Sequence, residues 1–114
     1  MPLEVYGDGS QISDMIYVTD VAEALVNALE TDVLDAPVEI GPREHTTVQE
    51  FAQTIIDMCA SDSRIVNLPM RPGEIPNSQV TADCSTLELI GMDADDLVSI
   101  EDGLRETIEY FRWL

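Results

Sequence analysis

An arginine ahead of a rigid turn is the segment of this 114-residue sequence best suited to chemistry. Arg71 is followed by Pro72 and Gly73, and Glu74 comes directly after them. A planar guanidinium forms paired hydrogen bonds with phosphate or carboxylate groups, which suits recognition of an anionic ligand. A surface arginine paired with one of the many acidic residues explains the same pattern, because such pairs are common and weak. On residue types alone, the surface pair is the preferred interpretation.

The other reactive residue types are better explained without catalysis. His45 is the single histidine, and because no nucleophile-elbow motif accompanies it, we expect a solvated loop histidine. Cys59 falls on an apolar helix face and is expected to be a buried small hydrophobic residue. Residues 93–96 lack the spacing of a calcium loop, and residues 7–9 lack the third glycine and the lysine of a phosphate-binding loop. The sequence therefore predicts a solvated acidic turn and a simple turn, with no catalytic, metal-ligating or cofactor-binding residue.

The charge balance excludes several functions. There are 23 acidic residues against 5 arginines and no lysine, which gives a net charge of −18. A negative chain is repelled by the phosphates of nucleic acids and by anionic lipids, so binding to either is excluded. Catalysis by a lysine of this chain is impossible because the chain has none. Because 45% of the residues are hydrophobic and periodic, we expect a folded domain rather than disorder. The acidic surface predicts a halophilic protein, adapted to concentrated salt, with a cation-binding or anion-mimicking surface as the alternative.

Length and cysteine content indicate a single domain in a reducing setting. A chain of 114 residues is close to the commonest domain size, so one domain spanning 1–114 is expected. Two cysteines do not indicate a disulfide scaffold in a chain that can bury a core. No stretch approaches the ~20 apolar residues of a membrane helix, and the first residues do not read as a signal peptide. A cytoplasmic location is the expectation.

The elements that must position these residues are short. A helix is predicted from Thr19 or Asp20, as its cap, to residue 30, with an apolar face. A capping box at Thr47 begins a second helix to residue 59, and Ser99 begins the last one. Asp83 is expected to cap a short helix over 84–90 that ends at Gly91. The predicted strands are 3–6, 37–40 and 64–68. The result is an α/β arrangement, α+β if the chain is a fragment, with three to four helices and a few short strands.

Three groups of motifs occur in an order that is typical of one family. The first is residues 5–11 (VYGDGSQ) with 14–22 (DMIYVTDVA), the second 39–41 (EIG) with 47–52 (TVQEFA), and the third 71–74 (RPGE) with 82–83, 89–92 and 99–108. Together they resemble the C-terminal third of the NAD-dependent epimerase/dehydratase family, the extended short-chain dehydrogenases that act on nucleotide sugars. Within this family, the motifs resemble those of UDP-glucose 4-epimerase.

The resemblance implies a C-terminal nucleotide-sugar-binding domain without the Rossmann domain that binds NAD. The parent enzyme would oxidise the sugar with NAD and then re-reduce or dehydrate the keto intermediate. This chain alone would be inactive and bind no NAD, because the family's NAD-binding motif and Tyr-x-x-x-Lys set are missing. Its expected partners are the nucleotide sugar, the N-terminal Rossmann half and, through an exposed apolar face, a second copy of itself in a homo-oligomer.

The same resemblance assigns roles to five substrate-binding residues. Arg71 matches an arginine that contacts the diphosphate, and Glu74 stands where the family has an aspartate near the ribose. Glu4 and Tyr6 lie where backbone groups bind the nucleobase. Ser13 stands where the family commonly has a second diphosphate-binding arginine. Three consequences stay open: the nucleotide binds more weakly, another arginine such as Arg64 substitutes, or the substrate is not a standard nucleoside-diphosphate sugar.

Two other functions stay open. A stand-alone acidic interaction domain that keeps the fold without catalysis is consistent with Ser13. A family reductase with another substrate is not separable from an epimerase or a dehydratase, because the residues that distinguish these reactions lie in the Rossmann half.

Overall fold

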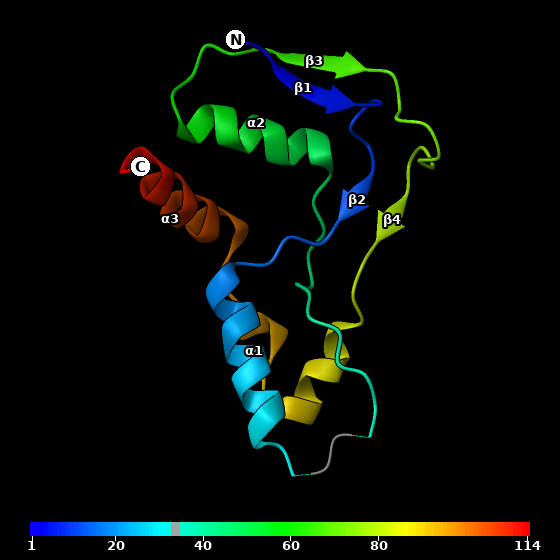
Figure 1. The fold of residues 1–114 in the computed structure, drawn as a ribbon, viewed down its shortest axis with the longest axis vertical. Coiled ribbons are helices and arrows are strands. Elements are labelled where there is room, and N and C mark those ends of the chain that lie inside the picture. The colour runs from blue at the N-terminus through cyan, green and yellow to red at the C-terminus, as the bar shows by residue number, and fades with distance from the viewer. Residues whose placement is uncertain (33–34) are drawn as a thin grey trace.

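The computed structural model describes residues 1–32 and 35–114, where helices alternate with two pairs of short parallel strands (Figure 1). The small mixed α/β arrangement expected from the sequence is confirmed. In chain order the elements are β1 (Leu3–Tyr6), β2 (Ile12–Ser13), α1 (Val18–Glu30), α2 (Val48–Met58), β3 (Ile65–Leu68), β4 (Gln79–Val80), the 3-10 helices η1 (Cys84–Ile90) and η2 (Ala94–Asp96), and α3 (Ile100–Arg112).

The first sheet is the parallel pair β1 and β3, with α2 packed on one face (Figure 1). Residues alternate between the two faces of a strand, and Val5 is buried while Glu4 and Tyr6 are exposed. Ala52 and Ile56 supply the buried side of α2. The predicted cap of this helix is confirmed, because the Thr47 side chain accepts a hydrogen bond from the backbone of Glu50.

The second sheet pairs β2 with β4 and leads into the other half of the molecule. That half has its own apolar core, formed by Ala24 of α1, Leu87 and Ile90 of η1, and Ala94 of η2. Leu87 is completely buried. The predicted helix over 84–90 is present as a 3-10 helix, and Gly91 ends it in the left-handed conformation at φ 71°.

The strand predicted at 37–40 is not formed. These residues have no hydrogen-bonded neighbouring strand in the described part of the chain. Instead, the Thr86 hydroxyl accepts a 2.7 Å bond from the Glu39 N–H and lies 3.0 Å from the Glu39 carbonyl oxygen. Val38 and Ile40 pack against the core, so the apolar pattern was correct but its partner is a helix.

The predicted cap of α1 is also wrong. The helix begins at Val18 after Tyr17, which makes no side-chain capping bond. Asp20 is 5% exposed, and its Oδ2 accepts a 2.8 Å hydrogen bond from the backbone N–H of Val98. This buried carboxylate therefore attaches α1 to the segment that leads into α3.

The prediction that Cys59 is buried is wrong as well. α2 ends at Met58, and Cys59 is an exposed residue that caps it. Ala60 follows in the left-handed region at φ 48°, which turns the chain away from the helix axis. The apolar stripe of α2 thus stops one residue earlier than the sequence pattern indicates.

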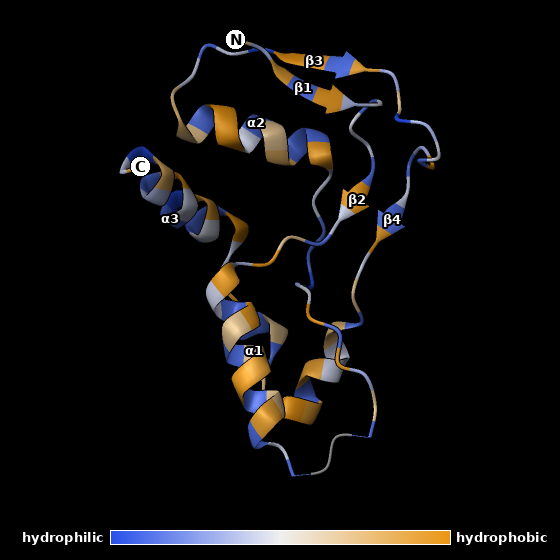
Figure 2. Ribbon diagram, in the orientation of Figure 1, coloured by the Kyte–Doolittle hydropathy of each residue, from blue (hydrophilic) through white to orange (hydrophobic). Residues whose placement is uncertain are grey.

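Helix α1 presents large apolar side chains to solvent. Ala24 is buried, whereas Leu25 is 61% and Leu29 is 86% exposed, although the sequence placed all three on one face. In Figure 2 this helix carries broad hydrophobic bands along its length. The radius of gyration is 16.4 Å, against about 13 Å for a compact domain of this length. The chain is therefore elongated and leaves apolar surface uncovered.

In residues 1–32 and 35–114, every helix is too short or too polar to cross a membrane.

Candidate functional site

The candidate site lies where β1 and β3 end. Because the strands are parallel, their carboxyl ends meet at one edge, with Tyr6 paired in register to Leu68. The loop after β1 and the loop after β3 both begin at this edge, and the latter contains Arg71. Ligands of open α/β sheets bind outside the carboxyl ends of the strands, so this edge is the candidate ligand-binding site.

Arg71 is held from two directions. Its guanidinium carbon lies 4.8 Å from the centre of the Tyr6 ring, which is a cation–π contact. One of its terminal nitrogens forms an ion pair with the Glu74 carboxylate. The hydrogen bond to Glu74 raises the pKa of Arg71 above its ordinary value, so this side chain stays cationic at any pH of interest. The arginine side chain is nevertheless 60% exposed and can meet a ligand.

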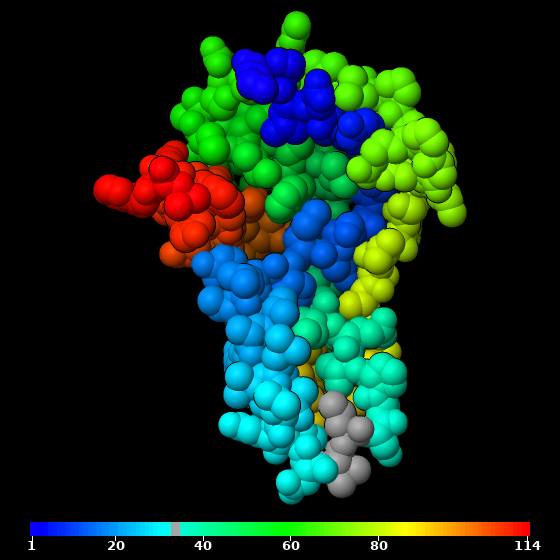
Figure 3. All heavy atoms as spheres, in the orientation of Figure 1, coloured from blue at the N-terminus to red at the C-terminus, as the bar shows by residue number. Residues whose placement is uncertain are grey.

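A cleft of about 270 Å³ opens beside this arginine. Its walls come from the loop after β1, the start of α2 and the loop after β3. In Figure 3 the yellow-green segment that carries Arg71 packs against the blue N-terminal strand and its loop. The lining residues that bear on ligand binding are Gln11, Val48, Arg71, Glu74 and Ser78.

The two loops are tied together at their far ends. The Ser10 N–H and hydroxyl donate to Asp8 Oδ1 at 2.9 and 2.6 Å, and the same hydroxyl contacts the Asn77 side chain. The bond from the Ser10 hydroxyl, followed by the one from its N–H, lowers the pKa of Asp8. Asn77 has φ 59°, a left-handed conformation that asparagine tolerates. These contacts hold the Arg71 loop against the loop after β1.

The glycines of the first loop do not fit a dinucleotide cradle. A Cβ at Gly7 would lie 2.3 Å from Met70 Sδ, and one at Gly9 would lie 2.6 Å from Gln49 Oε1. The space beside these glycines is filled by the protein itself. The loop also leads into β2 rather than into a helix, so it offers no helix N-terminus for a pyrophosphate. The loop after β1 therefore lacks the open backbone and the helix N-terminus that a pyrophosphate would use.

The structure brings together three of the five predicted substrate-binding residues. Arg71 contacts both Tyr6 and Glu74. Glu4 lies two residues earlier on the same face of β1, about 6–7 Å further along the strand. Ser13 lies in β2 and lines a separate cleft with Val80 and Ala82. Their binding roles stay predictions.

Arg64 is not placed to substitute for the arginine that the family has at the position of Ser13. It directly precedes β3 and accepts a 2.9 Å hydrogen bond from the Leu3 N–H through its carbonyl oxygen. Arg71 follows β3 at the other end. The two arginines therefore lie at opposite ends of the strand.

A buried carboxylate at the junction of the two halves was missed by the sequence analysis. The Asp14 side chain is 7% exposed, and its Oδ1 is 2.7 Å from Nδ1 of His45. Its Oδ2 accepts a 2.7 Å bond from the Ala82 N–H. A Cβ at Gly41 would lie 2.5 Å from Ala82 Cβ, so glycine is required there for close approach. His45 is an exposed loop residue, as predicted, and through its contact with Asp14 its segment is joined to the segments that carry Asp14 and Ala82.

The acidic turn at 93–96 is also more ordered than expected. It forms η2, and the Asp93 side chain accepts a hydrogen bond from the Asp95 N–H. Arg43 bridges the two aspartates at 3.2 and 2.7 Å. The Asp95 N–H, and then Arg43, lower the pKa of Asp93. The aspartates of this turn are exposed to solvent, as predicted, and two of them are also paired with Arg43.

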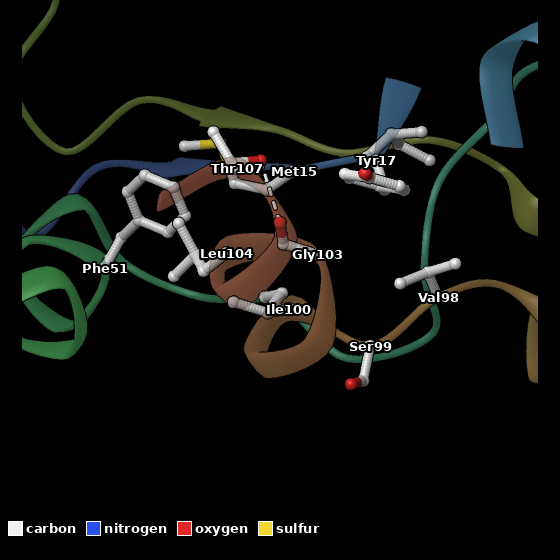
Figure 4. Close-up of a pocket in the computed structure, with 10 residues that line it drawn as sticks. Met15, Tyr17, Phe51, Val98, Ser99, Ile100, Gly103, Leu104 and Thr107 are labelled. Carbon is white, nitrogen blue, oxygen red and sulfur yellow. Dashed lines mark hydrogen bonds between the residues drawn. The ribbon is translucent and has the colours of Figure 1, made fainter. Parts of the chain in front are cut away.

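A second, apolar cavity of about 160 Å³ lies between α2, α3 and the segment before α1 (Figure 4). Phe51, Leu104 and the side chain of Met15 lie toward one side of it, and Tyr17 lies toward the other. The Thr107 hydroxyl, which also lines it, donates a 2.8 Å bond to the Gly103 carbonyl oxygen of its own helix. Among the described residues that line this cavity there is no carboxylate, imidazole, thiol or cation. Its polar side chains are the hydroxyls of Tyr17, Ser99 and Thr107.

Comparison with known proteins confirms the family resemblance: the chain matches the C-terminal part of the NAD-dependent epimerase/dehydratases. UDP-N-acetyl-alpha-D-glucosaminuronate decarboxylase of Bacillus cytotoxicus is 36% identical over 116 residues, which cover 96% of this chain and 35% of that protein. UDP-glucuronic acid decarboxylase 1 of Danio rerio is 36% identical, with 96% of this chain and 25% of the relative covered. The chain thus spans about a third or less of these relatives. No family model matches the sequence.

Solved structures give the same result. UDP-N-acetylglucosamine 4-epimerase from Methanobrevibacter ruminantium, in complex with UDP-N-acetylmuramic acid, is 32% identical with a TM-score of 0.85. UDP-glucose 4-epimerase from Thermotoga maritima, with UDP-glucose, is 30% identical with a TM-score of 0.86. Each match covers 98% of this chain and 35% of the other. The fold is therefore that of the corresponding part of these extended short-chain dehydrogenases.

Proposed function

We propose that this chain supplies the nucleotide-sugar-binding part of an NAD-dependent sugar-nucleotide epimerase or dehydratase. The observation that carries the proposal is the exposed cation of Arg71 beside a cleft at the carboxyl ends of β1 and β3. A guanidinium suits a diphosphate, and the relatives with UDP-sugars in their names or structures support this ligand class.

The residues described here would bind and orient the substrate rather than break bonds. NAD would supply the hydride chemistry from the rest of such an enzyme. The relatives include a decarboxylase and a reductase, so membership of the family does not by itself fix the reaction that the parent enzyme catalyses. Among these reactions, we propose one like that of UDP-glucose 4-epimerase.

Titration with UDP and with uridine, followed by NMR, tests the proposal. UDP is expected to shift the resonances of Tyr6, Arg71 and Glu74, whereas uridine, which lacks the diphosphate, is expected to shift the arginine signals much less. Equal responses to both compounds would contradict a diphosphate role for Arg71. No response to either would favour the stand-alone acidic interaction domain.

We also infer that the apolar side of α1 is covered in the assembled protein. The accessible surface of the chain is 7938 Å², against about 6,200 Å² for a compact monomer of its mass. Part of this excess lies on Leu25 and Leu29 of α1. The NAD-binding Rossmann portion is the proposed partner of this side, and when that portion is not present, a second copy of the chain takes its place in a homo-oligomer.

The acidic surface supports a salt-adapted protein, and thermal melting across a salt series checks this. At a net charge of −18, self-repulsion opposes the compact state, and raising the salt from 0.1 to 1 M shortens the screening length from about 10 to about 3 Å. The melting temperature is therefore expected to rise with salt. A melting temperature that does not change with salt would contradict the prediction. A cytoplasmic location likewise stays a prediction.

A further inference from the structure

We propose that Tyr6 and Glu74 hold the Arg71 guanidinium ready for a diphosphate, with the Glu74 carboxylate as an internal anion that the ligand displaces. This inference rests on the proposed function, because it assumes that Arg71 meets the diphosphate. It adds two roles: the Tyr6 side chain positions Arg71, and the Glu74 carboxylate competes with the ligand for Arg71.

Tyr6 is a rigid support for the arginine. It is the last residue of β1, and the ladder to Leu68 of β3 fixes its backbone. The side chain of Gln11 also donates a 3.1 Å hydrogen bond to the Tyr6 carbonyl oxygen. The ring therefore holds its position while Arg71, on a loop, lies over its face at 4.8 Å. A guanidinium held by its face keeps its N–H groups, which lie in its plane, available for an anion.

Glu74 occupies one terminal nitrogen of this guanidinium when no ligand is bound. Its backbone N–H donates a 3.1 Å bond to the Arg71 carbonyl oxygen, so the turn brings both side chains together. Gly73, at φ 86°, provides the left-handed residue that this turn requires. A carboxylate and a phosphate present similar oxygens to the guanidinium fork, and both cannot occupy the same donors. The ion pair therefore reduces the affinity for an incoming phosphate by the cost of breaking it.

Titration of the 114-residue chain with inorganic pyrophosphate at fixed ionic strength tests this arrangement. Pyrophosphate has no ribose or base, so any other contact of Glu74 with a nucleotide does not contribute. Glu74→Gln is expected to tighten pyrophosphate binding about two- to fivefold, which is the range for an exposed ion pair. Tyr6→Leu is expected to weaken it about two- to fivefold, and Tyr6→Phe, which keeps the ring, is expected to restore it.

A second measurement reports on the clamp without any ligand. The Tyr6 ring should shift the Arg71 side-chain proton resonances through its ring current, and Tyr6→Leu should abolish that shift while Tyr6→Phe keeps it. If Glu74→Gln fails to tighten pyrophosphate binding while Arg71→Ala abolishes it, the displaced-anion role is wrong and the proposed function stands. If Arg71→Ala leaves pyrophosphate binding unchanged, the proposed function itself fails. If Tyr6→Leu leaves the Arg71 resonances unchanged, the positioning role is wrong.

Discussion

Replacing Arg71 by alanine is expected to weaken UDP binding about 10- to 150-fold. This range corresponds to the loss of a charged hydrogen bond, about 1.5–3 kcal/mol. The reason is structural as well as electrostatic, because Arg71 is the cation that the structure places on the wall of the cleft at the carboxyl ends of β1 and β3. Isothermal titration calorimetry with UDP at fixed salt measures the effect.

Arg64→Ala is the matched control. It removes the same charge from the chain, so a general change in electrostatic attraction affects both variants equally. Arg64 precedes β3 whereas Arg71 follows it, and the control is therefore expected to bind UDP as the unmodified chain does. Equal weakening in the two variants would show that net charge, rather than the position of Arg71, governs binding.

Replacing Leu87 by alanine is expected to lower the free energy of unfolding by about 2–5 kcal/mol. Leu87 is 0% exposed and lies in the core shared by α1, η1 and η2, so its removal leaves a cavity. This loss is a large part of the stability of a domain of this size, which is about 5–15 kcal/mol in total. Urea denaturation followed by circular dichroism, at one salt concentration, measures it.

Leu89→Ala removes the same atoms from the same helix at a position that is 46% exposed. It is expected to lower the free energy of unfolding by much less, because little apolar surface is lost from the core and no closed cavity forms. Similar losses in the two variants would mean that the core of this half does not depend on Leu87.

Elements with local signals could be predicted from the sequence. Thr47, Asp83 and Ser99 each accept a backbone hydrogen bond at the start of their helices, as their residue types indicate. Gly91 adopts the left-handed conformation that ends η1. These outcomes depend on residues within a few positions of one another, so the sequence alone contains the necessary information.

Apart from the burial of Cys59, the features that the sequence did not predict depend on distant partners. Aspartate commonly caps helices, but the carboxylate of Asp20 accepts a hydrogen bond from the backbone N–H of Val98, which lies 78 positions away. The segment 37–40 has the apolar pattern of a strand, but Thr86 takes the place of a neighbouring strand. His45 gave no signal of its contact with Asp14. A single sequence does not show which side chains meet across such separations.

The candidate site was predicted in part. Arg71 and Glu74 were found from a four-residue motif and are paired in the structure. The contact of Tyr6 with Arg71 through its side chain could not be found in this way, because the family resemblance pointed only to its backbone. Glu4 shares a face of β1 with Tyr6, whereas Ser13 lies in β2 and lines a separate cleft, and the binding roles that the resemblance implies for both stay predictions.

The parallel pairing of β1 with β3 has a consequence for the order of folding. Leu3 pairs with Ile65, so the chain between them, which includes α1 and α2, must form a closed loop when the two strands meet. Closing so long a loop costs chain entropy before any strand contact compensates for it, and contacts of this kind form slowly. This pairing brings Tyr6 and the start of the loop that carries Arg71 to one edge of the sheet. We therefore expect the ligand cleft to be among the last parts of the molecule to assemble during refolding.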